Sequence, residues 1–157
     1  MFSPKNIAVI GASGSMGGAF YGQVKQRYPT AHICAFSRSA YQRIDYSCEA
    51  SISACANAIA KDQCWDLVIV TNGLLHEHGV MPEKSLKDLS AEKFHRLFQV
   101  NAVTPALIAK YFLPKLNRHN KSVFAVLSAR IGSVSDNRLG GWYAYRGAKA
   151  ALNMIIK

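Results

Sequence analysis

The stretch Ile7 to Gly18 reads IAVIGASGSMGG and decides how the chain folds. Its apolar start, Ile7–Ile10, is typical of a strand in a parallel sheet that helices cover on both faces. The glycines that follow indicate a tight turn at Gly11, and the spacing of apolar residues after it predicts a helix over Ser15–Gln26. The unpaired N–H groups and positive dipole end of such a helix favour an anion, and glycines let a pyrophosphate approach the backbone. The stretch therefore predicts a dinucleotide-binding turn, with an ordinary glycine-rich turn as the alternative.

Length and composition indicate one globular domain over residues 1–157. Half of the 157 residues are hydrophobic, which is enough for a real core. No apolar run approaches the roughly 20 residues of a membrane span, and no signal-peptide pattern opens the chain. We therefore expect no membrane partner and a cytoplasmic location. The four cysteines form no CxxC pair, which fits reduced thiols in that compartment.

The net charge of +10 comes from lysines and arginines scattered along the chain. Such a charge attracts a polyanionic small molecule such as a phosphorylated cofactor, and the lack of a long basic run disfavours nucleic acid as a partner. A metal site is not expected, because His76 and His78 lack a third ligand at a suitable spacing.

The second predicted strand, His32–Phe36, is followed by Ser37 and Arg38. In a dinucleotide fold this position contacts the adenosine ribose, where an acid suits a free 2′-hydroxyl and an arginine suits a 2′-phosphate. The chain has the arginine and no acid, so the sequence favours NADP(H) over NAD(H). A solvated surface arginine is the alternative.

The middle of the chain alternates between extended and helical patterns. The extended segment Gln42–Asp45 follows so soon that no full crossover helix fits before it. The carboxylate of Asp45 either accepts a bond from an adenine amino group or forms a turn. The pattern then predicts a helix over Glu49–Lys61 and a strand over Trp65–Val70, which Thr71-Asn72-Gly73 ends.

The next segments are helical, then extended. Met81–Gln99 holds a linker and an amphipathic helix, and Val100–Leu116 continues helically although Pro105 should disturb its first turn. At that junction the amide of Asn101 is either structural, or bonds a freed carbonyl and holds a water. Lys121–Leu127 is the fifth predicted strand.

The last stretch, WYAYRGAKAALNMIIK, is predicted to be a helix that carries the second chemical signal. Tyr145 and Lys149 lie four residues apart, so they share one helix face. An ammonium beside a phenol lowers a phenol pKa that starts near about 10. A tyrosine adjusted in this way exchanges a proton with a carbonyl oxygen.

On these residues the chain resembles the short-chain dehydrogenases/reductases over its whole length, and especially the C-factor and sniffer-type carbonyl reductases. The stretches that carry the resemblance are GASGSMG at 11–17, Ser37-Arg38, Asp45, TNGLLH from Thr71, Asn101, and residues 127–153. The resemblance implies an α/β fold with a doubly wound parallel, Rossmann-like sheet that lacks the C-terminal part usual for the family. It also implies NADP(H)-dependent reduction of a carbonyl or oxidation of an alcohol.

The resemblance also assigns site residues. It implies a catalytic set of Asn101, Ser128, Tyr145 and Lys149. It implies a cofactor site of Gly11, Ser13, Gly14, Ser15, Met16, Gly17, Ser37, Arg38, Asp45, Thr71, Asn72 and Gly73, together with Tyr145 and Lys149.

The chain departs from the family pattern at three places. Ser15 stands where the family has glycine, with Gly14 as the compensating neighbour, and Val70-Thr71-Asn72-Gly73 replaces an Asn-Asn-Ala-Gly motif. The slot of the catalytic serine falls on Ala129. Ser128 is the favoured substitute and Ser133 the other candidate.

Two function classes follow. The first is an oxidoreductase that reduces an aldehyde, ketone or quinone, and the second is a nucleotide-binding sensor or signal with little catalysis. A nucleotide-sugar epimerase shares the motifs but needs a larger C-terminal domain. The resemblance implies a small-molecule substrate and a homodimer or homotetramer. Because Lys157 falls inside the Tyr-Lys helix, we expect either a fragment or part of a longer protein.

Overall fold

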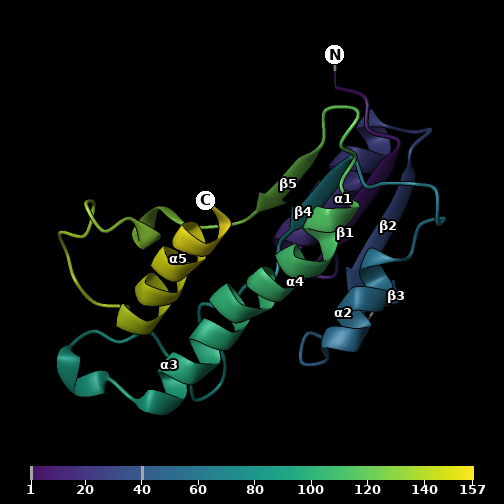
Figure 1. The fold of residues 1–157 in the computed structure, drawn as a ribbon. Coiled ribbons are helices and arrows are strands. Elements are labelled where there is room, and N and C mark those ends of the chain that lie inside the picture. Colours follow the sequence, from purple (N-terminus) through teal and green to yellow (C-terminus); the bar gives the residue numbers. More distant parts are fainter. Residues whose placement is uncertain (1, 40) are drawn as a thin grey trace. The chain divides into compact units, whose positions relative to one another are not determined.

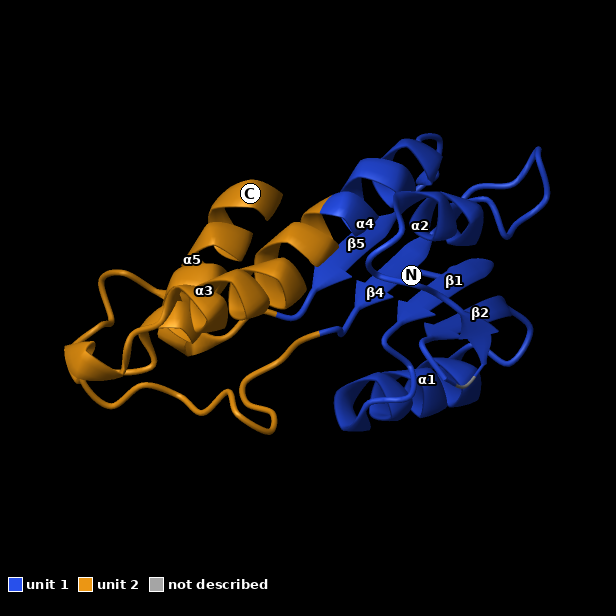
Figure 2. Cartoon of the chain, turned by 90° about the horizontal axis from the view of Figure 1, so that it is seen from below, with its two compact units in different colours: residues 1–72, 107–127 blue, residues 73–106, 128–157 orange. Residues whose placement is uncertain are grey.

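The computed structural model describes residues 2–39 and 41–157. The chain divides into two compact units, coloured separately in Figure 2. Unit 1 comprises Met1–Asn72 and Leu107–Leu127, and unit 2 comprises Gly73–Ala106 and Ser128–Lys157. Within the described residues, no helix has the length and apolar character that crossing a membrane requires.

Unit 1 is built on a five-stranded parallel sheet with the strand order β3-β2-β1-β4-β5. The strands are β1 (Asn6–Ile10), β2 (His32–Ser37), β3 (Gln42–Arg43), β4 (Leu67–Val70) and β5 (Val123–Val126). The order reverses between β1 and β4, and in open α/β sheets this switch point is where ligands bind, outside the carboxyl ends of the strands. Ile10 pairs with Val70 at those ends, so the predicted Gly11 turn lies at the switch point.

Both faces of the sheet are covered, as the apolar character of β1 predicts. Successive side chains of a strand point to opposite faces. Accordingly, Ala8 and Ile10 pack with residues of α2 (Glu49–Ala56) and α4 (Thr104–Phe112), and Ile7 and Val9 pack with residues of α1 (Ser15–Arg27). Figure 2 shows the strands between α1 on one side and α2 and the unit 1 part of α4 on the other. The predicted doubly wound α/β fold is confirmed.

Unit 2 is mainly helical. Its elements are a 3-10 helix (Leu86–Asp88), α3 (Ala91–Phe98), a π-helical turn (Gln99–Val103), a 3-10 helix (Arg130–Gly132) and α5 (Tyr143–Ile156), and α4 begins in unit 2 before continuing in unit 1, where a 3-10 helix (Leu113–Lys115) follows it. α3 and α5 lie side by side (Figure 1), and a Cβ on Gly147 would be only 3.3 Å from the Phe98 ring. The absence of a side chain at Gly147 therefore permits this close packing.

Several predicted helices and strands were longer than the observed ones. The helix predicted over Glu49–Lys61 ends at Ala56, because the side chain of Asn57 donates to the Ser53 carbonyl at 2.8 Å and ends the helix there. The strand predicted from Trp65 begins at Leu67, since Trp65 makes only an isolated bridge. The extended segments over 42–45 and 121–127 likewise contain strands of only two and four residues.

The predicted helix irregularity near Pro105 is confirmed. A π-helical turn over Gln99–Val103 precedes α4, and proline lacks the N–H that a regular helix needs. The Thr104 hydroxyl donates to the Gln99 carbonyl at 2.8 Å, and the Asn101 amide donates to the Leu97 carbonyl at 3.0 Å. Side chains thus satisfy a carbonyl group of the irregular turn and one just before it, at the end of α3.

Candidate functional site

The Gly11 turn of unit 1 has no room for side chains. Gly11 has φ +88°, and a Cβ there would lie 2.6 Å from the Thr71 hydroxyl oxygen, so glycine is required. A Cβ on Gly17 would overlap the carbonyl oxygen of Gly11. These two glycines let the start of α1 lie directly against the end of β1.

The start of α1 is exposed and carries no acidic residue. Gly14 is the N-cap and offers no side-chain cap, and the first turn contains no Asp or Glu. Ser13, Ser15 and Met16 are exposed around it. The N–H groups and positive end of the helix dipole therefore face outward at a place suited to an anion. Ser15 is the first helical residue and has no positive φ, so glycine is not needed at this departure from the family pattern.

The end of β2 presents the predicted arginine. Ser37 is buried and Arg38 is exposed, and the ion pairs among the described residues do not involve Arg38. Burial raises the pKa of the nearby Tyr46 to about 12, and the charge of Arg38 acts against that rise. The exposed guanidinium of Arg38 is thus available to bind an anionic partner.

Asp45 forms a local turn. Its Oδ1 accepts hydrogen bonds from the Ser47 hydroxyl at 2.6 Å and from the Ser47 backbone N–H at 2.9 Å, and these bonds hold the pKa of the carboxyl below its usual range. This geometry is that of the turn-forming alternative. Thr71 joins two strand ends, because its N–H and its hydroxyl both donate to the Ile10 carbonyl at 2.8 Å, and Asn72 after it is buried.

Unit 2 brings together four of the predicted residues. Lys149 on α5 is only 3 % exposed, and its Nζ lies 5.8 Å from the centre of the half-buried Tyr145 ring. A Cβ on Gly73 would lie 3.8 Å from that Nζ and 3.4 Å from the Asn101 Oδ1. Gly73, Asn101, Tyr145 and Lys149 therefore form one cluster, which we call the Tyr-Lys cluster.

Burial controls the ionisation of the Tyr-Lys cluster. It raises the pKa of Tyr145 and lowers the pKa of Lys149, because each group loses water around its charged form. The sequence-based prediction that Lys149 lowers the pKa of Tyr145 is therefore wrong for the chain alone. The Lys149 Nζ faces the tyrosine ring, and the loss of water around the phenol is what raises its pKa.

The Asn101 amide is fully engaged by backbone groups. Its Oδ1 accepts from the Leu74 N–H at 3.1 Å, and its Nδ2 donates to the Leu74 carbonyl at 2.8 Å and the Leu97 carbonyl at 3.0 Å. Both amide protons are thus used. The carbonyl contact of the second sequence alternative is observed, whereas the water of that alternative stays a prediction, and the same side chain clamps the segment that follows Gly73.

Sequence reasoning missed two residues next to the cluster, Asn153 and Gly132. Ser128 donates its hydroxyl proton to Asn153 Oδ1 at 2.5 Å, and Asn153 Nδ2 reaches the Gly132 carbonyl at 3.4 Å. A Cβ on Gly132 would lie 2.8 Å from the Lys149 Cβ, so only glycine permits this approach. The signal available was the spacing, since Asn153 lies four residues after Lys149 and shares its helix face.

The two serine candidates differ in their hydrogen bonding. Ser128 is exposed, and its proton is held by Asn153, whereas the Ser133 Oγ lies 3.2 Å from the Ser135 Oγ in an arrangement where either hydroxyl can donate. Ala129, in the expected serine slot, offers no hydroxyl.

Glu77, between the two histidines considered for a metal, forms an ion pair with Arg96 at 2.6 Å. The described residues contain no group of three His, Cys, Asp or Glu side chains arranged to hold a metal ion.

Residues 22–157 match the sequence family described as enoyl-(acyl carrier protein) reductase. The chain belongs to the short-chain dehydrogenases/reductases, which confirms the resemblance drawn from the sequence.

Two curated relatives are similar to parts of the chain. The 1-hydroxy-2-glutathionyl-2-methyl-3-butene dehydrogenase of Rhodococcus sp. (strain AD45) is 28% identical over 112 residues, covering 71% of this chain and 46% of the relative. The C-signal protein of Myxococcus xanthus is 37% identical over 73 residues, covering 46% of this chain and 44% of the relative. The chain thus spans less than half the length of these curated relatives.

The fold of the chain is also similar to those of solved structures. The NADPH-bound carbonyl reductase from chicken fatty liver superposes with a TM-score of 0.78 at 20% identity, over 99% of this chain and 69% of that one. At this identity the likeness establishes the fold.

Proposed function

We propose that the protein is an NADP(H)-dependent oxidoreductase that reduces the carbonyl group of an aldehyde, ketone or quinone to an alcohol. The observation that carries the proposal is the Tyr-Lys cluster, in which a half-buried phenol and a buried ammonium lie one turn apart on α5. Family membership supports it, as do a relative named as a dehydrogenase and a structural neighbour named as an NADPH-bound carbonyl reductase.

The residues of the Gly11 turn fit a nicotinamide dinucleotide. The turn excludes side chains at Gly11 and Gly17, so a pyrophosphate has access to the exposed start of α1. Arg38 would hold the 2′-phosphate, which favours NADP(H) over NAD(H). When bound, the cofactor supplies the hydride.

Tyr145 acts as the general acid. Its raised pKa keeps the phenol protonated at neutral pH, so the side chain donates a proton to the developing alkoxide oxygen. The opposite reaction needs the phenolate, which burial disfavours. The neutral phenol is the form that donation of a proton to a carbonyl oxygen requires.

Lys149 provides a positive charge beside the tyrosine and would hold a ribose hydroxyl of the cofactor. Asn101 positions this part of the site, because its amide clamps both backbone groups of Leu74 directly after Gly73. Since the Ser128 proton is held by Asn153, Ser133 becomes the stronger candidate for orienting the substrate carbonyl through a hydroxyl donor.

The proposed assembly is a homodimer or homotetramer. Met154 and Ile155 on α5 are 78% and 52% exposed, an apolar surface that a second subunit would cover. Light scattering at micromolar concentration measures the state directly.

The function is tested by following NADPH oxidation with a panel of aldehydes, ketones and quinones. Consumption of NADPH matched by formation of the alcohol supports the proposal. Stoichiometric NADPH binding with no turnover on any of the three substrate classes would instead favour a nucleotide-binding signal or sensor, the second class that the sequence allows.

A further inference from the structure

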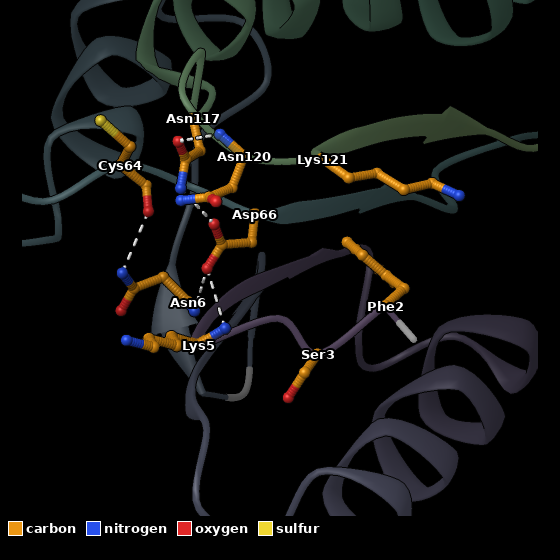
Figure 3. A pocket seen from close by; sticks show the side chains of 9 residues that line it. All are labelled: Phe2, Ser3, Lys5, Asn6, Cys64, Asp66, Asn117, Asn120 and Lys121. Carbon is orange, nitrogen blue, oxygen red and sulfur yellow. Dashed lines mark hydrogen bonds between the residues drawn. The ribbon is translucent and has the colours of Figure 1, made fainter.

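Unit 1 contains a second hollow, at the end of the sheet opposite the Gly11 turn. Its volume is about 710 Å³, and residues next to the starts of β1, β4 and β5 line it (Figure 3). β1 runs from Asn6 beside this groove to Ile10 before the turn, so the two places lie at opposite ends of one strand. We call the hollow the amino-end groove.

A buried carboxylate forms the floor of the groove. Asp66 is 7% exposed, and its Oδ2 accepts from the backbone N–H groups of Lys5 at 2.8 Å and Asn6 at 3.1 Å. Its Oδ1 accepts from Asn117 Nδ2 at 2.9 Å. Three donors therefore share its negative charge and fix its position. Asp66 is a structural group that joins three chain segments, and it is a poor ligand for a cation.

The other charged groups of the groove are donors with spare capacity. Lys5 and Lys121 are exposed, and among the described residues neither ammonium has a carboxylate within ion-pair distance. The Lys121 ammonium lies 5.9 Å from the centre of the Phe2 ring. Figure 3 shows the two lysine side chains on opposite sides of Asp66, each with its ammonium end directed away from that carboxylate, and Asn120 beside Asn117. The side chain of Asn120 adds a neutral donor and acceptor.

We propose that the amino-end groove binds a small metabolite that carries two anionic groups, phosphate or carboxylate, one near each lysine. Ammonium groups without acid partners favour acceptors with negative charge, and their placement on two sides favours a ligand charged at both ends. The middle of such a ligand would meet Asn120 and the one remaining acceptor position of Asp66, which suits a hydroxyl group. The net charge of +10 draws such anions toward the chain.

Isothermal titration calorimetry of the full chain tests the proposal with fructose 1,6-bisphosphate and with glutarate as the two probes. Fructose 6-phosphate and acetate, each with one anionic group, are the comparison ligands. We expect saturable binding of one doubly anionic probe per chain, and weaker binding of its singly substituted counterpart. The probe that binds more tightly identifies the anionic group.

The variants Lys5→Gln and Lys121→Gln should each weaken that binding about two- to fivefold, because each removes one exposed ionic contact. Lys25→Gln, which removes an exposed lysine from α1 outside the groove, should leave it unchanged. Equal weakening by all three variants would show a general charge effect and overturn the proposal. Failure of both doubly anionic probes to bind would also overturn it.

The site must also be separate from the Gly11 turn. Binding of the probe should persist in the presence of saturating NADPH, and displacement by NADPH would overturn the assignment to the groove. The measurement with probe alone does not depend on cofactor binding, so the proposal stands or falls independently of the proposed reductase activity.

Discussion

The replacement Gly17→Ala tests whether the contact between the start of α1 and the end of β1 builds the cofactor site. The new Cβ would overlap the Gly11 carbonyl oxygen and lie 2.7 Å from both the Gly11 carbonyl carbon and the Thr71 hydroxyl oxygen. Two of these atoms are backbone, so the start of α1 must move away from Gly11. That displacement disturbs the N–H groups that we propose bind the pyrophosphate.

The same helix contains a matched control. Gly22 is exposed, and a Cβ there meets nothing within 4 Å, so Gly22→Ala gains about 1 kcal/mol of stability from helix propensity alone. Gly17→Ala has the same gain, offset by an overpacking cost of about 1–3 kcal/mol. The free energies of unfolding of the two variants should therefore differ by about 1–3 kcal/mol in urea titrations, with Gly22→Ala the more stable.

The larger effect is on the cofactor. Loss of one hydrogen bond to a phosphate costs about 1.5–3 kcal/mol, which is roughly 10- to 150-fold in Kd. NADPH fluorescence titration should show this loss in Gly17→Ala and an unchanged Kd in Gly22→Ala. Equal NADPH affinity of the two variants, with Gly17→Ala folded, would refute the reasoning.

Three further outcomes follow. Arg38→Asp should reverse the cofactor preference, measured as the ratio of Kd values for NADPH and NADH, and equal affinity of the unchanged protein for both cofactors would contradict the role of Arg38. The rate of carbonyl reduction should fall as pH rises through the alkaline range, since the proton of Tyr145 and the positive charge of Lys149, whose pKa is lowered, are both lost with rising pH; a rate that increases with pH would disagree with this. Asn153→Leu should lower kcat more than it raises KM, because it frees the segment around Gly132 that packs on Lys149, and Ser128→Ala should reproduce part of the effect. Identical kinetics in Asn153→Leu and the unchanged protein would show that Asn153 is not part of the site.

The features that sequence predicts best are those with one local cause. The glycines of the Gly11 turn indicate a place with no room for side chains, and the structure has no such room at Gly11 and Gly17. The alternating faces of β1 follow from the period of a strand. The π-helical turn before α4 lies next to Pro105, whose missing N–H is visible in the sequence.

The features that sequence missed depend on contacts between distant residues. Nothing near Tyr145 indicates that burial outweighs the charge of Lys149, because burial is a property of the folded chain. The bond between Ser128 and Asn153 joins residues 25 positions apart, and the close approach of Gly132 to Lys149 is of the same kind. The early end of α2 is an exception with a local cause, because one bond from the Asn57 side chain to the Ser53 carbonyl ends the helix and helix propensity does not reveal that bond.

The most direct test of the central claim is single-turnover reduction of a carbonyl substrate by the NADPH-loaded protein and its variant Tyr145→Phe. The variant keeps the ring and loses the proton donor, and the control Tyr143→Phe removes a hydroxyl from the first turn of the same helix. We predict that Tyr145→Phe slows reduction by about 10²–10⁴-fold with NADPH affinity nearly unchanged, while Tyr143→Phe reacts as the unchanged protein does. Reduction by Tyr145→Phe at the unchanged rate would contradict the account.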